Sequence, residues 1–336
     1  MSQRRRPGRR LLKALLPVAL LLVLGVGAGL LFIVHTIARP VTHPYLVTPE
    51  TFPAYSARGL RVSEEHWANA DGTEARGWLL RGAEGAPAVV LLHRYGADRS
   101  WLLNLGVKIN EATNCTVLWP DLRGHGEKPK ITSTTFGARE TSDVAAAVAF
   151  LRQLKSTQGQ RPLVGARFGF YGVELGAYAA LAATAPARPS GNTPGAASEV
   201  RALVLDSIPA SPDELLGHAT RDRLGFDNGL LNLLTRGAAR LYFLGRYENE
   251  DSCTLASRLT GQRVLLLSGQ DAGKLRESTR ALAQCFPASP PVGLQIDLPV
   301  TGFTASSATG EQGETYDRLV IEFFSQAFNE DSTPRR

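Results

Sequence analysis

Residues 168–182 join an apolar run to an alanine-rich helical pattern through the short sequence Gly-Val-Glu-Leu-Gly at residues 172–176. A strand that ends in a sharp turn and continues directly as a helix has this pattern. Strand and helix units of this kind build sheets that are covered by helices. The residue at the centre of the turn is Glu174, so the tip carries a carboxyl group.

The rest of the chain repeats the alternation of strands and helices. The predicted strands lie at residues 60–67, 75–80, 88–92, 116–119, 202–205, 264–267 and 295–298, and the clearest helical patterns lie at 141–154, 230–244 and 316–328. The first two strands flank a hairpin turn at residues 69–73. The continuous apolar runs have the character of buried parallel strands. We therefore predict an α/β fold with a mostly parallel central sheet and helices on both faces.

The net charge of the chain comes from its first residues. Residues 1–13 contain six Lys and Arg and no acid, and the remaining 31 basic residues equal the 31 acidic residues. The formal charge of +6 therefore reflects a basic terminus and does not indicate a nucleic-acid-binding surface. The sequence has neither a zinc-type Cys/His spacing nor a Gly-rich phosphate loop, so we expect no metal and no cofactor.

A long uncharged segment follows the basic terminus. Residues 14–34 carry no charge and would form a helix of about 31 Å, which matches the hydrocarbon core of a bilayer. Arginines precede this segment and only Arg39 lies just after it, which places the N-terminus in the cytoplasm. We predict a single-pass protein of the cytoplasmic membrane with an extracytoplasmic C-terminal domain. A cleaved signal peptide is the alternative.

The three cysteines leave two interpretations open. Cys253 and Cys285 flank one predicted strand, and a disulfide between them would stabilise the fold by about 3–4 kcal/mol. The alternative is three buried free thiols, with Cys115 as the third. A disulfide would fit the predicted location outside the cytoplasm.

With these elements in order, the sequence resembles the α/β-hydrolase superfamily, in particular bacterial membrane-anchored members related to lysophospholipases and dienelactone hydrolases. Five motifs in the family's order carry the resemblance: the strand and oxyanion loop at residues 89–96, an Asp-x-Arg-Gly-His-Gly turn at 121–126, the turn at 172–176, and the strand ends at 203–207 and 265–271. The family's turn reads Gly-x-Ser-x-Gly and is called the nucleophile elbow. The resemblance covers about residues 60–328 and implies the α/β-hydrolase fold.

The resemblance also completes the expected domain organisation. In chain order we predict a basic cytoplasmic tail (1–13), a transmembrane helix (14–38), a linker (39–59), the α/β-hydrolase-like domain (60–328) with a small helical lid insert at about 208–260, and a disordered tail (329–336). One large domain thus accounts for most of the 336 residues.

The residues that the family uses for catalysis are replaced in this sequence. Glu174 stands at the position of the nucleophilic serine, Ala272 at that of the acid, and Phe303 at that of the histidine. Asp271, one residue before Ala272, is a candidate vestigial acid. No histidine follows His218, so a small shift of the alignment cannot restore the triad. The resemblance therefore implies a degenerate triad and no catalytic residue.

The residues around the turn form a candidate ligand-binding or structural site instead. A carboxylate at the turn can accept the N–H hydrogen bonds that would otherwise hold an oxyanion. We predict an ion pair within about 4 Å between Glu174 and Arg94, which replaces a glycine of the family's oxyanion loop. Tyr95, whose backbone N–H belongs to that loop, and Leu175 complete the expected ligand-binding residues. His93 and His125 are expected to shape their own loops.

The sequence thus favours a protein that has lost catalysis. A serine hydrolase needs a hydroxyl activated by an imidazole, and a carboxylate that orients the imidazole. We expect a membrane-anchored pseudo-hydrolase that serves as a binding or scaffolding module for a small acyl or peptide-like ligand, without nucleic acid; protein partners are left open. The alternative is an esterase, lipase or peptidase that uses Glu174, Asp271 and a displaced histidine.

Overall fold

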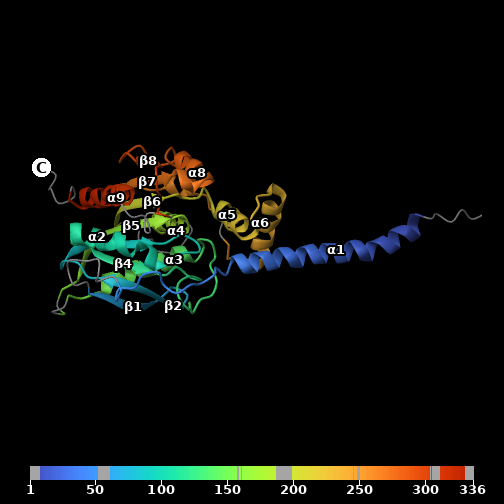
Figure 1. Ribbon diagram of the computed structural model, residues 1–336, viewed down its shortest axis with the longest axis horizontal. Helices are drawn as coiled ribbons and strands as arrows, with labels where there is room; N and C mark the ends of the chain where they lie inside the picture. The colour runs from blue at the N-terminus through green and yellow to red at the C-terminus, as the bar shows by residue number, and fades with distance from the viewer. Residues whose placement is uncertain are drawn as a thin grey trace, which may run out of the picture.

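The computed structural model describes most of the chain. The described residues are 8–51, 61–156, 159, 161–186, 199–244, 246–247, 250–302, 304 and 311–329. The first residues of the basic tail, residues 52–60 of the predicted linker, Phe303 and the predicted tail beyond residue 329 lie outside the described residues. Figure 1 shows a domain with a central sheet, from which one long helix projects.

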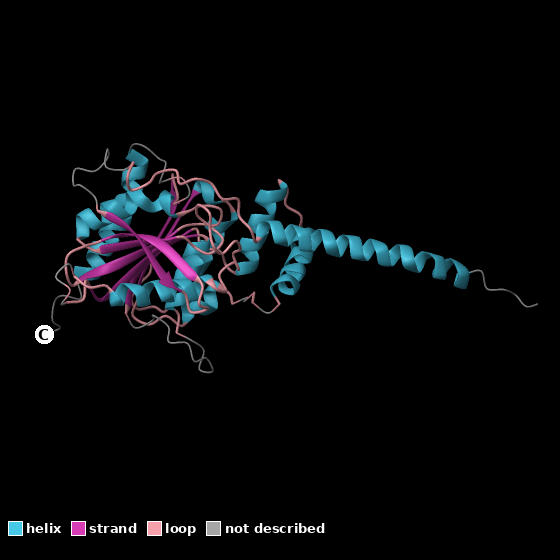
Figure 2. Cartoon of the chain, turned by 90° about the horizontal axis from the view of Figure 1, so that it is seen from below, coloured by secondary structure: helices cyan, strands magenta, loops and turns pink. Residues whose placement is uncertain are grey.

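A twisted eight-stranded sheet forms the centre of the domain (Figures 1 and 2), in the order β1-β2-β4-β3-β5-β6-β7-β8. The strands are β1 (Val62–Ala68), β2 (Glu74–Leu80), β3 (Ala86–Leu92), β4 (Thr116–Pro120), β5 (Val164–Val173), β6 (Val200–Asp206), β7 (Arg263–Gly269) and β8 (Gly293–Leu298). Strand β2 pairs antiparallel with β1 and β4, and all other neighbours are parallel. The predicted α/β fold with a mostly parallel sheet is confirmed.

Helices cover both faces of the sheet. One face packs against α3 (Glu140–Gln153) and α4 (Leu175–Thr184), and the other against α2 (Leu103–Thr113) and α9 (Glu311–Asn329). Strand β3 is buried on both faces from Ala88 to Leu92, which explains why its sequence is apolar without alternation. Helices α5 (Pro212–Leu224), α6 (Gly229–Phe243) and α7 (Ser252–Ser257) lie between β6 and β7, and α8 (Lys274–Leu282) lies between β7 and β8.

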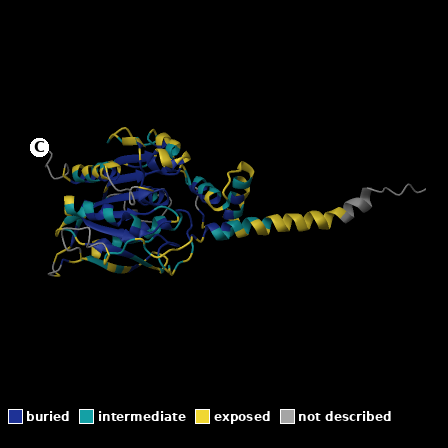
Figure 3. Ribbon diagram, viewed as in Figure 1, coloured by how far each residue is buried: buried dark blue, intermediate teal, exposed yellow. Residues whose placement is uncertain are grey.

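The projecting helix is α1, Gly8–Ile37. Its segment Leu15–Ile37 is long and apolar enough to cross a membrane, and most of that segment is exposed (Figure 3). The last turn differs, because Val34 and Ile37 are fully buried in the core that also contains α3 and α4. Figure 3 shows this change from exposed to buried along the helix. The end of the candidate membrane helix is thus part of the domain core.

The residues that follow α1 also pack on the domain. The hydroxyl of Tyr45 donates a hydrogen bond of 2.6 Å to Asp121, and the guanidinium of Arg99 lies 4.8 Å from the centre of the Tyr45 ring. This part of the predicted linker is therefore held against the domain.

A disulfide joins Cys253 on α7 to Cys285, with 5.1 Å between the Cα atoms and a separation of 32 residues in sequence. Cys115 is free and buried. Since a loop of this length restricts the unfolded chain, replacing both Cys253 and Cys285 with Ser should lower the free energy of unfolding by about 3–4 kcal/mol. Thiol counting under denaturing, non-reducing conditions should find one reactive thiol per chain, and three would contradict the bridge.

Candidate functional site

The turn between β5 and α4 has a strained backbone at its central residue. Glu174 adopts φ 51° and ψ −105°, a conformation that L residues rarely occupy. The flanking glycines permit the turn: a Cβ on Gly176 would lie 2.2 Å from the carbonyl oxygen of Leu92, and one on Gly172 would lie 2.5 Å from the nitrogen of Ala177. Gly172 therefore lets β5 turn closely onto the start of α4, and Gly176 lets the turn approach the end of β3.

The side chain of Glu174 is buried at the C-terminal ends of the parallel strands. It is only 2% exposed, and its carboxyl group accepts a hydrogen bond from the backbone N–H of Tyr95. Burial raises the pKa of Glu174 to about 8, while the positive charge of Arg94 and the Tyr95 N–H act in the opposite direction. At neutral pH the carboxyl group is therefore mostly protonated.

Arg94 lies on the loop that faces the Glu174 turn. Its guanidinium is 5.3 Å from the centre of the Trp101 ring, and its Nη1 donates a hydrogen bond of 3.5 Å to the carbonyl oxygen of Tyr95. Its charge lowers the pKa of Glu174, so the two groups interact electrostatically. A direct contact between Arg94 and Glu174 within about 4 Å stays a prediction.

An imidazole lies beside Glu174, as the alternative function with a displaced histidine requires, although the sequence did not indicate which histidine it is. Nδ1 of His218, on α5, is 3.6 Å from Oε1 of Glu174 and 3.3 Å from Oδ2 of Asp222. The distance to Glu174 exceeds a hydrogen bond. Burial lowers the pKa of His218 and raises that of Glu174, so both groups are largely neutral near pH 7. The i,i+4 spacing of His218 and Asp222 was the only sequence signal for this pair.

The same nitrogen of His218 faces both carboxyl groups. In a serine hydrolase triad the orienting carboxylate binds one ring nitrogen and the nucleophile binds the other. The arrangement of Glu174, His218 and Asp222 therefore differs from a proton relay.

Asp206 ends β6 next to the turn and is fully buried. It accepts hydrogen bonds from the backbone N–H of Gly302 at 2.6 Å, from the hydroxyl of Ser207 at 2.7 Å, and from the hydroxyl of Tyr316 on α9. Burial raises the pKa of Asp206 to about 6, although these hydrogen bonds lower it. Backbone and tyrosine groups thus satisfy this carboxylate, and it has a role in holding the loop after β8 and α9 in place.

The comparisons with solved structures identify the fold. An esterase from Pyrococcus furiosus matches 87% of this chain and 98% of its own, with 18% sequence identity and a TM-score of 0.59. The esterase LipW from Mycobacterium marinum matches 84% of this chain and 85% of its own, with 19% identity and a TM-score of 0.57. The chain has the α/β-hydrolase fold. No family model matches the sequence, and the search of curated proteins gave no match either.

A peptidase also has a similar structure. An acylaminoacyl peptidase from Pyrococcus horikoshii matches 83% of this chain and 43% of its own, with 14% identity and a TM-score of 0.53. Esterases and a peptidase therefore share this fold at similarly low sequence identity. At these identities the likeness establishes the α/β-hydrolase fold, and the chemistry of this chain has to be argued from its own residues.

The predicted position of the triad acid lies directly after β7 in this α/β-hydrolase fold. Asp271 Oδ2 accepts hydrogen bonds from the hydroxyls of Thr301 at 2.8 Å and Thr304 at 3.1 Å. Ala272 is buried and has no side-chain group that could orient a base. Phe303 lies outside the described residues. Asp271 therefore binds the loop that would carry the family's histidine.

His93 and His125 are buried in the loops that follow β3 and β4. His93 bonds the carbonyl oxygen of Arg94 through Nδ1 at 2.8 Å, and its Nε2 accepts the N–H of Leu122 at 3.0 Å. His125 bonds the carbonyl oxygen of Arg123 through Nδ1 at 2.9 Å. Burial lowers the pKa of His93 to about 4 and that of His125 to about 3. Both imidazoles stay neutral and hold loops.

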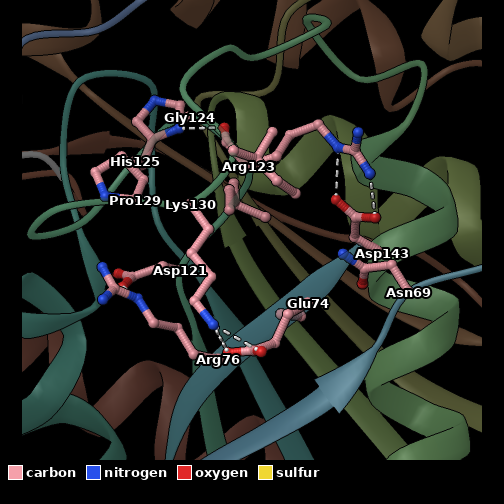
Figure 4. A pocket seen from close by; sticks show the side chains of 13 residues that line it. Asn69, Glu74, Arg76, Asp121, Arg123, Gly124, His125, Pro129, Lys130 and Asp143 are labelled. Atoms are coloured by element: carbon pink, nitrogen blue, oxygen red, sulfur yellow. Dashed lines mark hydrogen bonds and ion pairs between the residues drawn. The ribbon is translucent and has the colours of Figure 1, made fainter. Parts of the chain in front are cut away.

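The cavity beside the His125 loop is lined by charged groups that pair with one another (Figure 4). Arg123 binds Asp143 at 2.5 Å and 2.7 Å, and Lys130 binds Glu74 at 2.8 Å. The volume of about 40 Å³ fits little more than water. Among the described residues, no group of three or more His, Cys, Asp or Glu could hold a metal ion.

Proposed function

We propose that this protein is a membrane-anchored pseudo-hydrolase whose domain binds a ligand or scaffolds a partner without catalysis. The buried carboxyl group of Glu174 carries the proposal, because it occupies the tip of the turn and takes the hydrogen bond of the Tyr95 N–H. In an active enzyme of this fold, that N–H would stabilise the negative charge of the transition state. We propose that the turn is a vestigial nucleophile elbow.

The protonation of Glu174 supports the absence of covalent catalysis. A carboxylate nucleophile must be ionised to attack a carbonyl carbon. With its pKa raised to about 8, Glu174 is mostly the uncharged acid at neutral pH. His218 cannot ionise it efficiently, because burial lowers the pKa of the imidazole as well.

The anchor of this pseudo-hydrolase is α1, with its N-terminus in the cytoplasm and the domain outside. The apolar segment Leu15–Ile37 and the basic residues before it support this orientation. The disulfide between Cys253 and Cys285 supports it as well, since such bonds persist in oxidising compartments. The buried last turn of α1 disfavours cleavage at this point, because removing α1 would take Val34 and Ile37 from the core.

We propose a small peptide-like ligand at Arg94, Tyr95, Glu174 and Leu175, reached when α5 and α6 move aside. A cavity of about 170 Å³ between α5, α6 and α8 adjoins this position, and His218 lines it. Its other lining side chains are mostly polar or charged, among them Glu214, Arg221, Arg236 and Lys274. Such a lining suits the amide and charged groups of a peptide better than an acyl chain.

A second candidate function is hydrolysis with Glu174 and His218 as the reacting pair. The contact of 3.6 Å between them, with Asp222 beside the same imidazole, favours it. Binding of a substrate could shorten this contact, since catalytic hydrogen bonds are often long in free enzymes.

One assay separates the two functions. The full-length protein in detergent micelles should leave a panel of nitrophenyl esters and peptide anilides unhydrolysed above background, and it should not react with a fluorophosphonate probe. The reason is that neither a free hydroxyl nor an ionised carboxylate is present at the turn. Saturable turnover that is lost in both Glu174→Gln and His218→Gln would establish the hydrolase instead. An exposed substitution such as Glu322→Gln serves as the control for preparation effects.

A further inference from the structure

Helix α6 exposes a continuous apolar stripe. Leu230, Leu233, Leu234 and Leu241 are between 40% and 66% exposed, and Leu244 directly after the helix is 78% exposed. Their spacing places them on one side of the helix, whereas Thr235, Ala239 and Phe243 lie on the opposite, buried side. Four leucines on one exposed helix face, with Leu244 directly after the helix, form a patch that soluble surfaces rarely leave uncovered.

The position of α6 relates this stripe to the candidate membrane helix. Nδ1 of His35, near the end of α1, lies 3.0 Å from the hydroxyl of Tyr242 on α6, and the two rings meet edge to face. Figures 1 and 2 show α6 crossing α1 beside the domain. If α1 stands across a bilayer, α6 lies at the level where α1 leaves it. Figure 3 shows exposed residues on the side of α6 turned away from the domain.

The charges of α6 fit a lipid surface. The helix contains Arg236 and Arg240 and neither Asp nor Glu. The side chain of Arg240 is 56% exposed, pairs with Asp213 at 3.2 Å and borders the leucine stripe by its helical position, whereas Arg236 lines the cavity between α5, α6 and α8. Long arginine side chains can lie along apolar surface while their charged ends reach lipid phosphates.

We propose that α6 lies in the outer interface of the bilayer that α1 crosses, with its leucine stripe among the lipid chains. This inference rests on the proposed anchoring by α1. An amphipathic helix with leucines on one face and an arginine at its border binds membranes in this orientation. Helix α5 lies beside Glu174 through His218, and α5 and α6 line one cavity. A membrane that holds α6 would therefore restrict the movement of α5, and ligand entry would depend on the lipid surface.

Depth-dependent fluorescence quenching tests the proposal in the full-length protein. Leu233→Cys and Leu241→Cys are each labelled with bimane, since Cys115 is buried and the other two cysteines are bridged. The proteins are reconstituted into vesicles of three parts phosphatidylcholine to one part phosphatidylglycerol, with nitroxide groups near the headgroup or deep in the chains. We expect both labels to be quenched several-fold more by the shallow nitroxide than a label at exposed Glu322→Cys on α9.

A label at Leu24→Cys in the middle of α1 distinguishes a wrong inference about α6 from a wrong proposal about anchoring by α1. If this label is quenched by the deep nitroxide while the α6 labels behave like the α9 label, α1 is an anchor and the inference about α6 is wrong. If the Leu24 label is not quenched and the protein does not float with the vesicles, the anchoring itself is wrong. Disulfide cross-linking of the unlabelled Leu233→Cys or Leu241→Cys protein between two chains, without quenching of the labelled protein, would show that a second copy covers the stripe and would overturn the proposal.

Discussion

Replacing Glu174 with Gln should stabilise the domain at pH 8 and leave its stability nearly unchanged at pH 5. Burial raises the pKa of Glu174 from 4.5 to about 8 in the folded protein. The unfolded chain therefore releases this proton near its ordinary pKa, while the folded state keeps it until about pH 8. As pH rises between these two values, the free energy of unfolding of wild type falls, because only the unfolded chain releases the proton. Gln carries no such proton, so the free energy of unfolding of the variant does not fall for this reason.

The expected gain is on the order of 3–5 kcal/mol at pH 8, from the size of the pKa difference. It is measured as the free energy of unfolding by urea at several values between pH 5 and pH 8, with both proteins in the same detergent. Asp143 and Asp206 also have pKa values raised to about 6, but they are present in both proteins and cancel in the difference. The exposed control Glu322→Gln should show no pH-dependent gain. If the free energies of unfolding of Glu174→Gln and wild type differ by the same amount at every pH, Glu174 is ionised in the folded protein and its pKa is not raised.

Most of the sheet could be predicted because its strands are buried on both faces. Such strands must be continuously apolar, and the runs at Ala88–Leu92 and Val264–Leu267 were visible without any knowledge of their neighbours. The turn at Glu174 was also readable, since its two glycines are required locally by close backbone contacts. These features depend on residues that are adjacent in sequence.

The surroundings of Glu174 could not be predicted in the same way. His218 reaches it from α5, and the path of a helix between β6 and β7 is set by packing rather than by local pattern. The bonds of Asp206 to Gly302 and Tyr316 likewise join three distant segments. The sequence showed which catalytic residues of the family are replaced. The residues that surround Glu174 and Asp206 in the fold could be found only from the three-dimensional structure.

The end of α1 was assigned to the membrane segment, whereas the structure places it in the domain core. An apolar helix for a bilayer and an apolar helix turn for a protein core have the same composition, so hydropathy cannot separate them. The backbone provides a second attachment, because the carbonyl oxygen of Ile37 accepts a hydrogen bond of 2.6 Å from the hydroxyl of Tyr95. The candidate membrane helix is thereby connected to the loop whose N–H binds Glu174.

This connection predicts a large loss of stability when the last turn of α1 is trimmed. The double variant Val34→Ala and Ile37→Ala should lower the free energy of unfolding of the domain by about 3–6 kcal/mol, because both side chains are fully buried. The matched control is Leu22→Ala with Leu24→Ala, two exposed positions of the same helix that should leave the domain nearly unaffected. Urea unfolding followed by tryptophan fluorescence of the full-length proteins measures the difference.

The comparison also tests whether α1 and the site are coupled. Loosening the last turn weakens the support of Tyr95, so the double variant should expose Glu174 to water and move its pKa back toward 4.5. The stability of the variant should therefore fall less between pH 5 and pH 8 than that of wild type. The prediction is wrong if the free energy of unfolding changes equally with pH in the double variant and in wild type, and if the double variant loses no more stability than the Leu22 and Leu24 control. The end of α1 would then contribute nothing to the domain core, and the domain would fold independently of α1.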